Sequence, residues 1–157
     1  MSELGWISGR FLPNNSGRFE SRWATVKVPS TTNAIMLQNM QETTLGIWIA
    51  HGEGRYVPAA DSAADSTTQT AMVYVDHERN ATENYPENPN GSYQGITGIC
   101  SKDGRHLAMM PHPERSIYQW QSSWMPSEIK EELDQLGYQE FYPWFEMFRN
   151  AYNWCKV

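Results

Sequence analysis

Cysteine is nearly absent from this chain of 157 residues, which has only Cys100 and Cys155. Two widely spaced thiols exclude a disulfide framework and are typical of a reducing compartment, so a cytoplasmic location is expected. Neither cysteine lies in the Gly-x-Cys-x-Gly turn that exposes a nucleophile between a strand and a helix. No apolar run is long enough to cross a bilayer and no signal-peptide pattern opens the chain, so no membrane association is expected.

Basic residues are also few, with 12 Lys and Arg against 18 Asp and Glu and a formal net charge of −6. No basic stripe is visible, which argues against a nucleic-acid partner. Aromatic residues, by contrast, are abundant, with 7 Trp, 8 Tyr and 5 Phe. They can fill the core of one domain of this length, and they also favour a face that packs against a larger partner.

Short or alternating apolar runs predict five strands, at residues 19–28, 45–50, 71–75, 96–100 and 106–110. The last two flank Lys102-Asp103-Gly104-Arg105, which predicts a hairpin. Residues 59–69, rich in Ala, Ser, Asp and Thr, are expected to form either a polar helix or a surface insertion.

Helices are expected mainly near the C-terminus. Residues 128–136 predict a helix that Ser127 caps and Gly137 ends, and Pro143 is typical of the start of a second helix. Helical spacing in that second helix predicts a buried face that includes Cys155, and residues 33–40 predict a further short helix. Strands closed by helices indicate an α/β domain, and the pattern matches the later half of such a domain better than a whole one.

The segment Pro111-His112-Pro113-Glu114-Arg115 holds the most specific chemistry in the chain. It follows a predicted strand, and in extended backbone residues i and i+2 lie on the same side. A carboxylate at Glu114 can therefore orient the His112 ring and stabilise its imidazolium form, which is the base-and-orienter part of a nucleophilic triad. On its own such a pair is more often an ordinary surface contact.

Several further motifs agree on one family. In order along the chain they are Asn15-Ser16-Gly17-Arg18-Phe19-Glu20-Ser21-Arg22, Ala50-His51-Gly52-Glu53-Gly54-Arg55, Asn88-Pro89-Asn90-Gly91-Ser92, Gly95-Ile96-Thr97-Gly98-Ile99 and Met109-Met110-Pro111-His112-Pro113-Glu114-Arg115. Together they resemble the glutaminase domain of phosphoribosylformylglycinamidine synthases, a class I glutamine amidotransferase. The resemblance implies a flavodoxin-like, three-layer α/β fold, of which residues 1–157 would be the C-terminal part, with the hairpin and the closing helices.

The resemblance also implies a chemistry and a set of partners. Glutamine would be hydrolysed by a cysteine thiolate, with His112 as the base and Glu114 as the orienting acid, and the ammonia would pass to an ATP-dependent synthetase domain in purine biosynthesis. The nucleophilic cysteine of the family lies in an N-terminal part of the domain that this chain does not include, so the chain alone is expected to be inactive. No cofactor is expected in this chain, and ATP and Mg are expected in the synthetase domain.

Two interpretations stay open for the turn that contains His51, Gly52 and Gly54. Its backbone N–H groups suit the carboxylate at the amino-acid end of glutamine, but a strand-ending turn with a satisfied His–Glu pair is about equally consistent. No metal site is expected, because the spacing of the four histidines matches no ligand pattern. The alternative function is a non-catalytic docking module, derived from an amidotransferase, that binds through its aromatic face.

Overall fold

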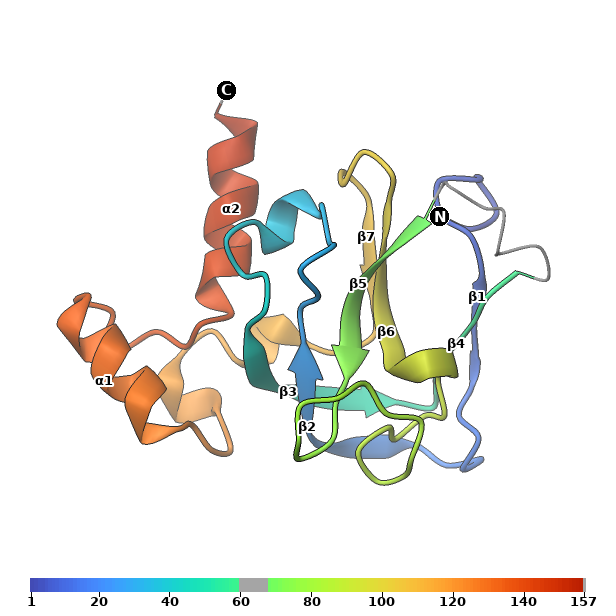
Figure 1. The fold of residues 1–157 in the computed structure, drawn as a ribbon, viewed down its shortest axis with the longest axis horizontal. Helices are drawn as coiled ribbons and strands as arrows, with labels where there is room; N and C mark the ends of the chain where they lie inside the picture. Colours follow the sequence, from blue (N-terminus) through green and yellow to red (C-terminus); the bar gives the residue numbers. More distant parts are fainter. Residues whose placement is uncertain (60–67, 157) are drawn as a thin grey trace.

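The computed structural model describes residues 1–59 and 68–156. Within them, seven strands form two sheets in which every strand pair is antiparallel. The two-stranded sheet pairs β1 (Arg10–Pro13) with β4 (Glu53–Val57). The order of the five-stranded sheet is β3 (Thr44–His51), β2 (Glu20–Lys27), β5 (Thr68–Tyr74), β6 (Ile96–Ser101) and β7 (Leu107–Met109). Two helices, α1 (Ser127–Gln135) and α2 (Phe145–Cys155), follow the strands (Figure 1).

The predicted α/β class, with a hairpin and closing helices, is confirmed, and so are the five predicted strands. In β2, Ala24 and Val26 are buried whereas Thr25 between them is exposed, as expected for a sheet with one face against a core. The hairpin joins β6 to β7 with Gly98 opposite Met109 and Cys100 opposite Leu107.

The segment after β7 connects the two edges of the five-stranded sheet. The Met110 backbone N–H still donates to the Thr97 carbonyl of β6, at 3.2 Å, on the β7 side. Two residues later, the His112 N–H donates to the Trp48 carbonyl of β3, at 2.8 Å, and the two residues form an isolated antiparallel bridge. Because β3 and β7 are the opposite edges of the sheet, this bridge closes a curled sheet at His112.

The main core lies on the face of β3 that carries Leu45, Ile47 and Ile49, each at most 4% exposed. Trp144, at the start of α2, is fully buried in the same cluster, and its indole Nε1 donates to the Gly46 carbonyl at 2.8 Å. This hydrogen bond satisfies the one polar atom of the indole, so α2 is fixed to the sheet at its first turn.

The prediction that Cys155 belongs to the core is wrong. Only the first part of α2 packs on the core, through Trp144, Met147 and Phe148, and the helix then continues beyond it towards the C-terminus (Figure 1). Cys155 and Trp154, at its far end, are exposed. Helical spacing identifies a common face of a helix, but it does not show how far along the helix its partner extends.

Three other predictions had different outcomes. Residues 33–40 form only a single 3-10 turn, Ile35–Leu37, rather than a short α-helix. Ser127 is the first residue of α1, Pro126 holds the N-cap position and no side chain caps the helix, so the predicted cap is wrong. Gly137 follows the helix with a φ of 78°, as expected for a residue that ends a helix. Residues 60–67, most of the predicted polar insertion, lie outside the described residues.

Candidate active site

His112 and Glu114 lie in direct contact, as the sequence predicted. The Nδ1 atom of His112 is 2.7 Å from the Oε1 atom of Glu114, and the two side chains are 28% and 52% exposed. The predicted local geometry was wrong, because β7 ends at Met109 and the residues after His112 form a 3-10 turn, Pro113–Arg115. Pro113, at the first position of this turn, has no N–H to leave unsatisfied and a φ suited to it. The turn, not an extended strand, brings the carboxylate to the ring.

This contact determines which ring nitrogen of His112 is available to a substrate. An ionised carboxylate only accepts hydrogen bonds, so Nδ1 is the nitrogen that donates its proton to Glu114. In the neutral ring, Nε2 then carries the lone pair and can accept a proton. Arg115 Nε lies 3.8 Å from the same Glu114 oxygen. The arrangement is that of a general base with its orienting acid.

His51 lies close to this pair, but its ring is buried. It ends β3, only 5% of it is exposed, and it is the direct cross-strand partner of Glu20 on β2. Burial lowers the pKa of His51 below its usual 6.5, the nearby His112 lowers it further, and Glu20 opposes the shift. The imidazole of His51 is therefore held neutral at the end of the core face of β3.

The two glycines after His51 differ in what they allow. A Cβ on Gly54 would lie 2.8 Å from His51 Nδ1, so glycine at this position makes room for the imidazole. A Cβ on Gly52 would meet only the Phe19 ring, at an ordinary contact distance of 3.8 Å, so this position is less crowded. The structure brings His51, Gly52 and Gly54 together; their predicted role in binding substrate stays a prediction.

The segment from Asn88 to Ser92 is structural scaffolding beside the glycine turn. Asn90 Nδ2 donates to the Gly54 carbonyl at 2.8 Å, and Asn88 Oδ1 accepts from the backbone N–H groups of Gly91 and Ser92. Asn88, Asn90 and Ser92 are all buried. Buried amides with satisfied hydrogen bonds fix the loop in one conformation.

Neither cysteine is placed to act as a nucleophile with His112. Cys100 is fully buried in β6, its Sγ lies 3.3 Å from Asn33 Oδ1, and burial raises the pKa of its thiol. Cys155 is exposed, but it lies at the far end of α2. A thiolate nucleophile needs a lowered pKa or an adjacent base.

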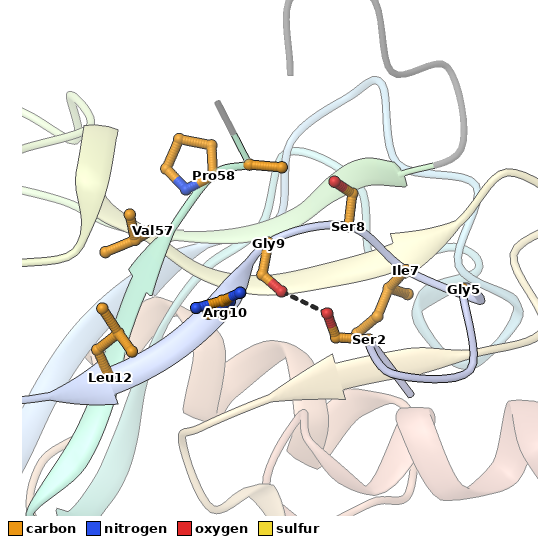
Figure 2. A pocket seen from close by; sticks show the side chains of 10 residues that line it. Ser2, Gly5, Ile7, Ser8, Gly9, Arg10, Leu12, Val57 and Pro58 are labelled. Carbon is orange, nitrogen blue, oxygen red and sulfur yellow. Dashed lines mark hydrogen bonds between the residues drawn. The ribbon is translucent and has the colours of Figure 1, made fainter. Parts of the chain in front are cut away.

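The structure has a separate surface cavity of about 650 Å³ between the N-terminal residues and the two-stranded sheet (Figure 2). Ser2 closes one side of it by donating a hydrogen bond from Oγ to the Gly9 carbonyl, at 2.7 Å. Among the described residues that line it, Arg10 is the one with a charged side chain, and neither His112 nor Glu114 borders it. Among residues 1–59 and 68–156 there is no group of His, Cys, Asp and Glu side chains arranged to hold a metal, and no helix long and apolar enough to span a membrane.

Sequence reasoning missed the functional setting of Glu20 and Trp48. Glu20 points to the same face of β2 as Ala24 and Val26, so the alternating sequence pattern predicts a carboxylate on the core side of this strand. Trp48, whose carbonyl receives the His112 N–H, carries no such signal, because the bridge depends on how the whole sheet curls.

The chain is similar to proteins of one kind. The family model for a CobB/CobQ-like glutamine amidotransferase domain matches residues 1–155. A phosphoribosylformylglycinamidine synthase of Drosophila melanogaster is 51% identical over 92% of this chain, and the Homo sapiens synthase is 46% identical over 90%. The chain spans about a tenth of the length of each of these relatives.

A solved structure shares the fold. A chain in the structure of PurLQS from Thermotoga maritima superimposes with a TM-score of 0.65 at 24% identity, over 98% of this chain and 56% of the other. This likeness shows the fold, and the family match covers nearly the full length of the chain. The chain belongs to the family of CobB/CobQ-like glutamine amidotransferase domains.

Proposed function

We propose that this chain is part of the glutamine-hydrolysing domain of a phosphoribosylformylglycinamidine synthase, acting in purine biosynthesis in the cytoplasm. The single observation that carries the proposal is the His112–Glu114 contact of 2.7 Å in a chain 51% identical to a synthase of that name. Ammonia from glutamine would serve an ATP- and Mg-dependent synthetase domain, which converts formylglycinamide ribonucleotide to formylglycinamidine ribonucleotide.

The proposed reaction uses Nε2 of His112 as a proton carrier. His112 takes the proton from a cysteine thiol, the thiolate attacks the amide carbon of glutamine, and the same proton leaves with the ammonia. Water, activated by the again neutral His112, then hydrolyses the thioester to glutamate and restores the thiol. Glu114 holds the ring in the required tautomer and stabilises its charged form.

The thiol in this scheme comes from outside this chain. Cys100 is buried with a raised pKa, and Cys155 lies on an exposed helix end. We therefore expect the chain to hydrolyse no glutamine alone and to need the nucleophile-bearing part of the same amidotransferase domain. Members of a triad act as a unit, so a base without its nucleophile supplies little catalysis.

Glutamine would be bound beside the glycine turn. The less crowded position at Gly52 and the N–H groups of this turn suit the carboxylate of the amino-acid end of the substrate. His51 supports the turn from the buried side, where it packs against Gly54.

The proposal is tested by His112→Ala in the full-length protein. Glutamine-dependent synthesis should be lost, while synthesis from added ammonium chloride persists, because the base serves only the release of ammonia. Glu114→Gln should lower glutamine-dependent turnover by about two to four orders of magnitude. His77→Ala, at a histidine whose side chain is 96% exposed, is the matched control and should leave both activities unchanged.

The same variants separate this function from a docking module. Trp120 and Trp124, at 80% and 67% exposed, are the residues through which a docking module would bind. If His112→Ala leaves glutamine-dependent synthesis intact while Trp120→Ala abolishes binding to the rest of the protein, the catalytic proposal is wrong. Loss of synthesis from both glutamine and ammonium chloride in His112→Ala would instead make His112 a structural residue.

A further inference from the structure

Three buried polar side chains near His112 have atoms without a hydrogen-bond partner among the described residues. They are Oδ1 of Asn14, Oε1 of Glu20 and both ring nitrogens of His51. All three residues are between 4% and 5% exposed. Buried polar atoms are normally paired, because water cannot compensate them. Several unpaired atoms from neighbouring residues indicate that something binds between them.

The three residues form one cluster. Glu20 and His51 are directly opposite each other in the β2–β3 register, so their side chains lie on the same face with Cβ atoms about 5 Å apart. Asn14 is tied to the same strand end, since its Nδ2 donates to the His51 carbonyl at 2.8 Å. His112 bridges to Trp48, three residues before His51 on β3, so the proposed catalytic base lies near this end of the strand.

The chemistry of the unpaired atoms limits what can bind. A carboxylate oxygen and an amide oxygen only accept hydrogen bonds, so the bound molecule must donate at least two. The other Glu20 oxygen, Oε2, is occupied by Arg22, which itself donates to the Tyr85 hydroxyl at 2.6 Å. His51 is neutral because of its burial and adds no positive charge that would repel a cation. The site therefore suits a very small, positively charged hydrogen-bond donor.

We propose that Asn14, Glu20 and His51 form a binding site for ammonium. This inference rests on the proposed function, because cleavage of the glutamine amide at His112 releases ammonia next to the cluster. Ammonium donates in four directions, and the unpaired acceptors come from β2, from β3 and from the residue after β1. The nitrogen departs as NH3 when the thioester forms, takes one further proton from water to become ammonium, and is held by the cluster before it leaves the domain.

A cation of similar size tests the site directly. Crystals of the full-length protein are soaked in rubidium chloride, because rubidium resembles ammonium in radius and is located by its anomalous scattering. A peak is expected within coordination distance of Asn14 Oδ1 and Glu20 Oε1, and ammonium chloride should displace it. Glu20→Gln should remove the peak or raise the rubidium concentration needed by about tenfold or more, because a charge-assisted contact is lost. Glu42→Gln should keep the rubidium peak. The Glu42 carboxylate is exposed and pairs with Lys27, which lies on β2 as Glu20 does.

Two results would overturn the site: a water molecule that rubidium never replaces, or a rubidium peak that survives Glu20→Gln at the same concentration. A second measurement compares the glutamate formed with the ribonucleotide product formed. Glu20→Gln should raise this ratio severalfold as ammonia escapes, whereas an unchanged ratio contradicts the inference. The rubidium experiment needs no catalysis. If the wild-type full-length protein hydrolyses no glutamine, the proposed function is refuted, and the rubidium peak alone then decides whether the cation site exists.

Discussion

Gly54 has one hydrogen atom where any other residue would have a side chain, and the His51 ring occupies the space. Gly54→Ala should lower the free energy of unfolding by about 1–3 kcal/mol, because the new methyl group would lie 2.8 Å from His51 Nδ1 and force the ring to move. Gly52→Ala is the matched control and should cost less, since its Cβ meets only Phe19 at 3.8 Å. Chemical denaturation of both variants measures the difference, and equal losses would contradict the packing explanation.

Burial of His51 also predicts a dependence of stability on pH. The unfolded chain binds a proton at this residue as the pH falls through about 6.5, whereas the folded protein, with its lowered pKa, stays neutral to lower pH. Stability is therefore lost as the pH falls below 6.5, by up to about 1.4 kcal/mol per pH unit from this residue. His51→Gln should flatten this slope in unfolding curves between pH 6.5 and 5, and His77→Gln should not. A slope that is unchanged in His51→Gln would show that other groups cause it.

Individual residues show how far the sequence alone could reach. Proximity of His112 to Glu114 follows from a separation of two residues, and both an extended strand and a 3-10 turn satisfy it, so the contact was predictable although its geometry was not. Pairing of Glu20 with His51 depends on the register of two distant strands, which no local pattern determines.

Helix α2 divides into a packed beginning and an exposed end, and the two parts should respond differently to truncation. Trp144→Ala should lower the free energy of unfolding by about 3–5 kcal/mol, because it empties a fully buried site and removes the hydrogen bond to Gly46. Trp154→Ala, near the far end of the same helix, should cost less than about 1 kcal/mol, since it loses little beyond its contact with Arg105. Thermal unfolding of the two variants tests the division, and similar losses would show that the outer part of α2 is packed in the full-length protein.

The strands and helices were more predictable than their ends and environments. Alternation located β2 because it has one buried face, a short apolar run located β3, and the hairpin followed from its glycine turn. The exposure of Cys155 was not predictable, because it depends on the length of the surface against which α2 packs. The 3-10 turn at Ile35–Leu37 shows the same limit, since three residues contain too little periodicity to separate it from an α-helix.

Closure of the curled sheet depends on few contacts, and Trp48 makes two of them. Its carbonyl accepts the His112 N–H, and its indole Nε1 donates to the Gln121 carbonyl at 2.7 Å, on the segment that follows His112 and Glu114. Trp48→Phe keeps an aromatic ring but removes the second bond, and it should cost about 1 kcal/mol. Amide exchange at His112 should become faster as this segment loosens.

The neighbouring Trp23 supplies the control for this experiment. It lies opposite Trp48 in the β2–β3 register, and the two rings contact each other edge to face. Trp23→Phe alters the same aromatic pair without touching the bond to Gln121, so exchange at His112 should stay close to the wild-type rate. Equal acceleration in both variants would mean that ring packing, rather than the hydrogen bond, holds the edges together.

The position of the His112 side chain depends on the whole five-stranded sheet, because this residue contacts β3 while its own segment continues from β7 at the opposite edge. A chain in which any strand between those edges is misplaced would not bring His112 to Trp48. The place of this one imidazole therefore reports whether all five strands are in order.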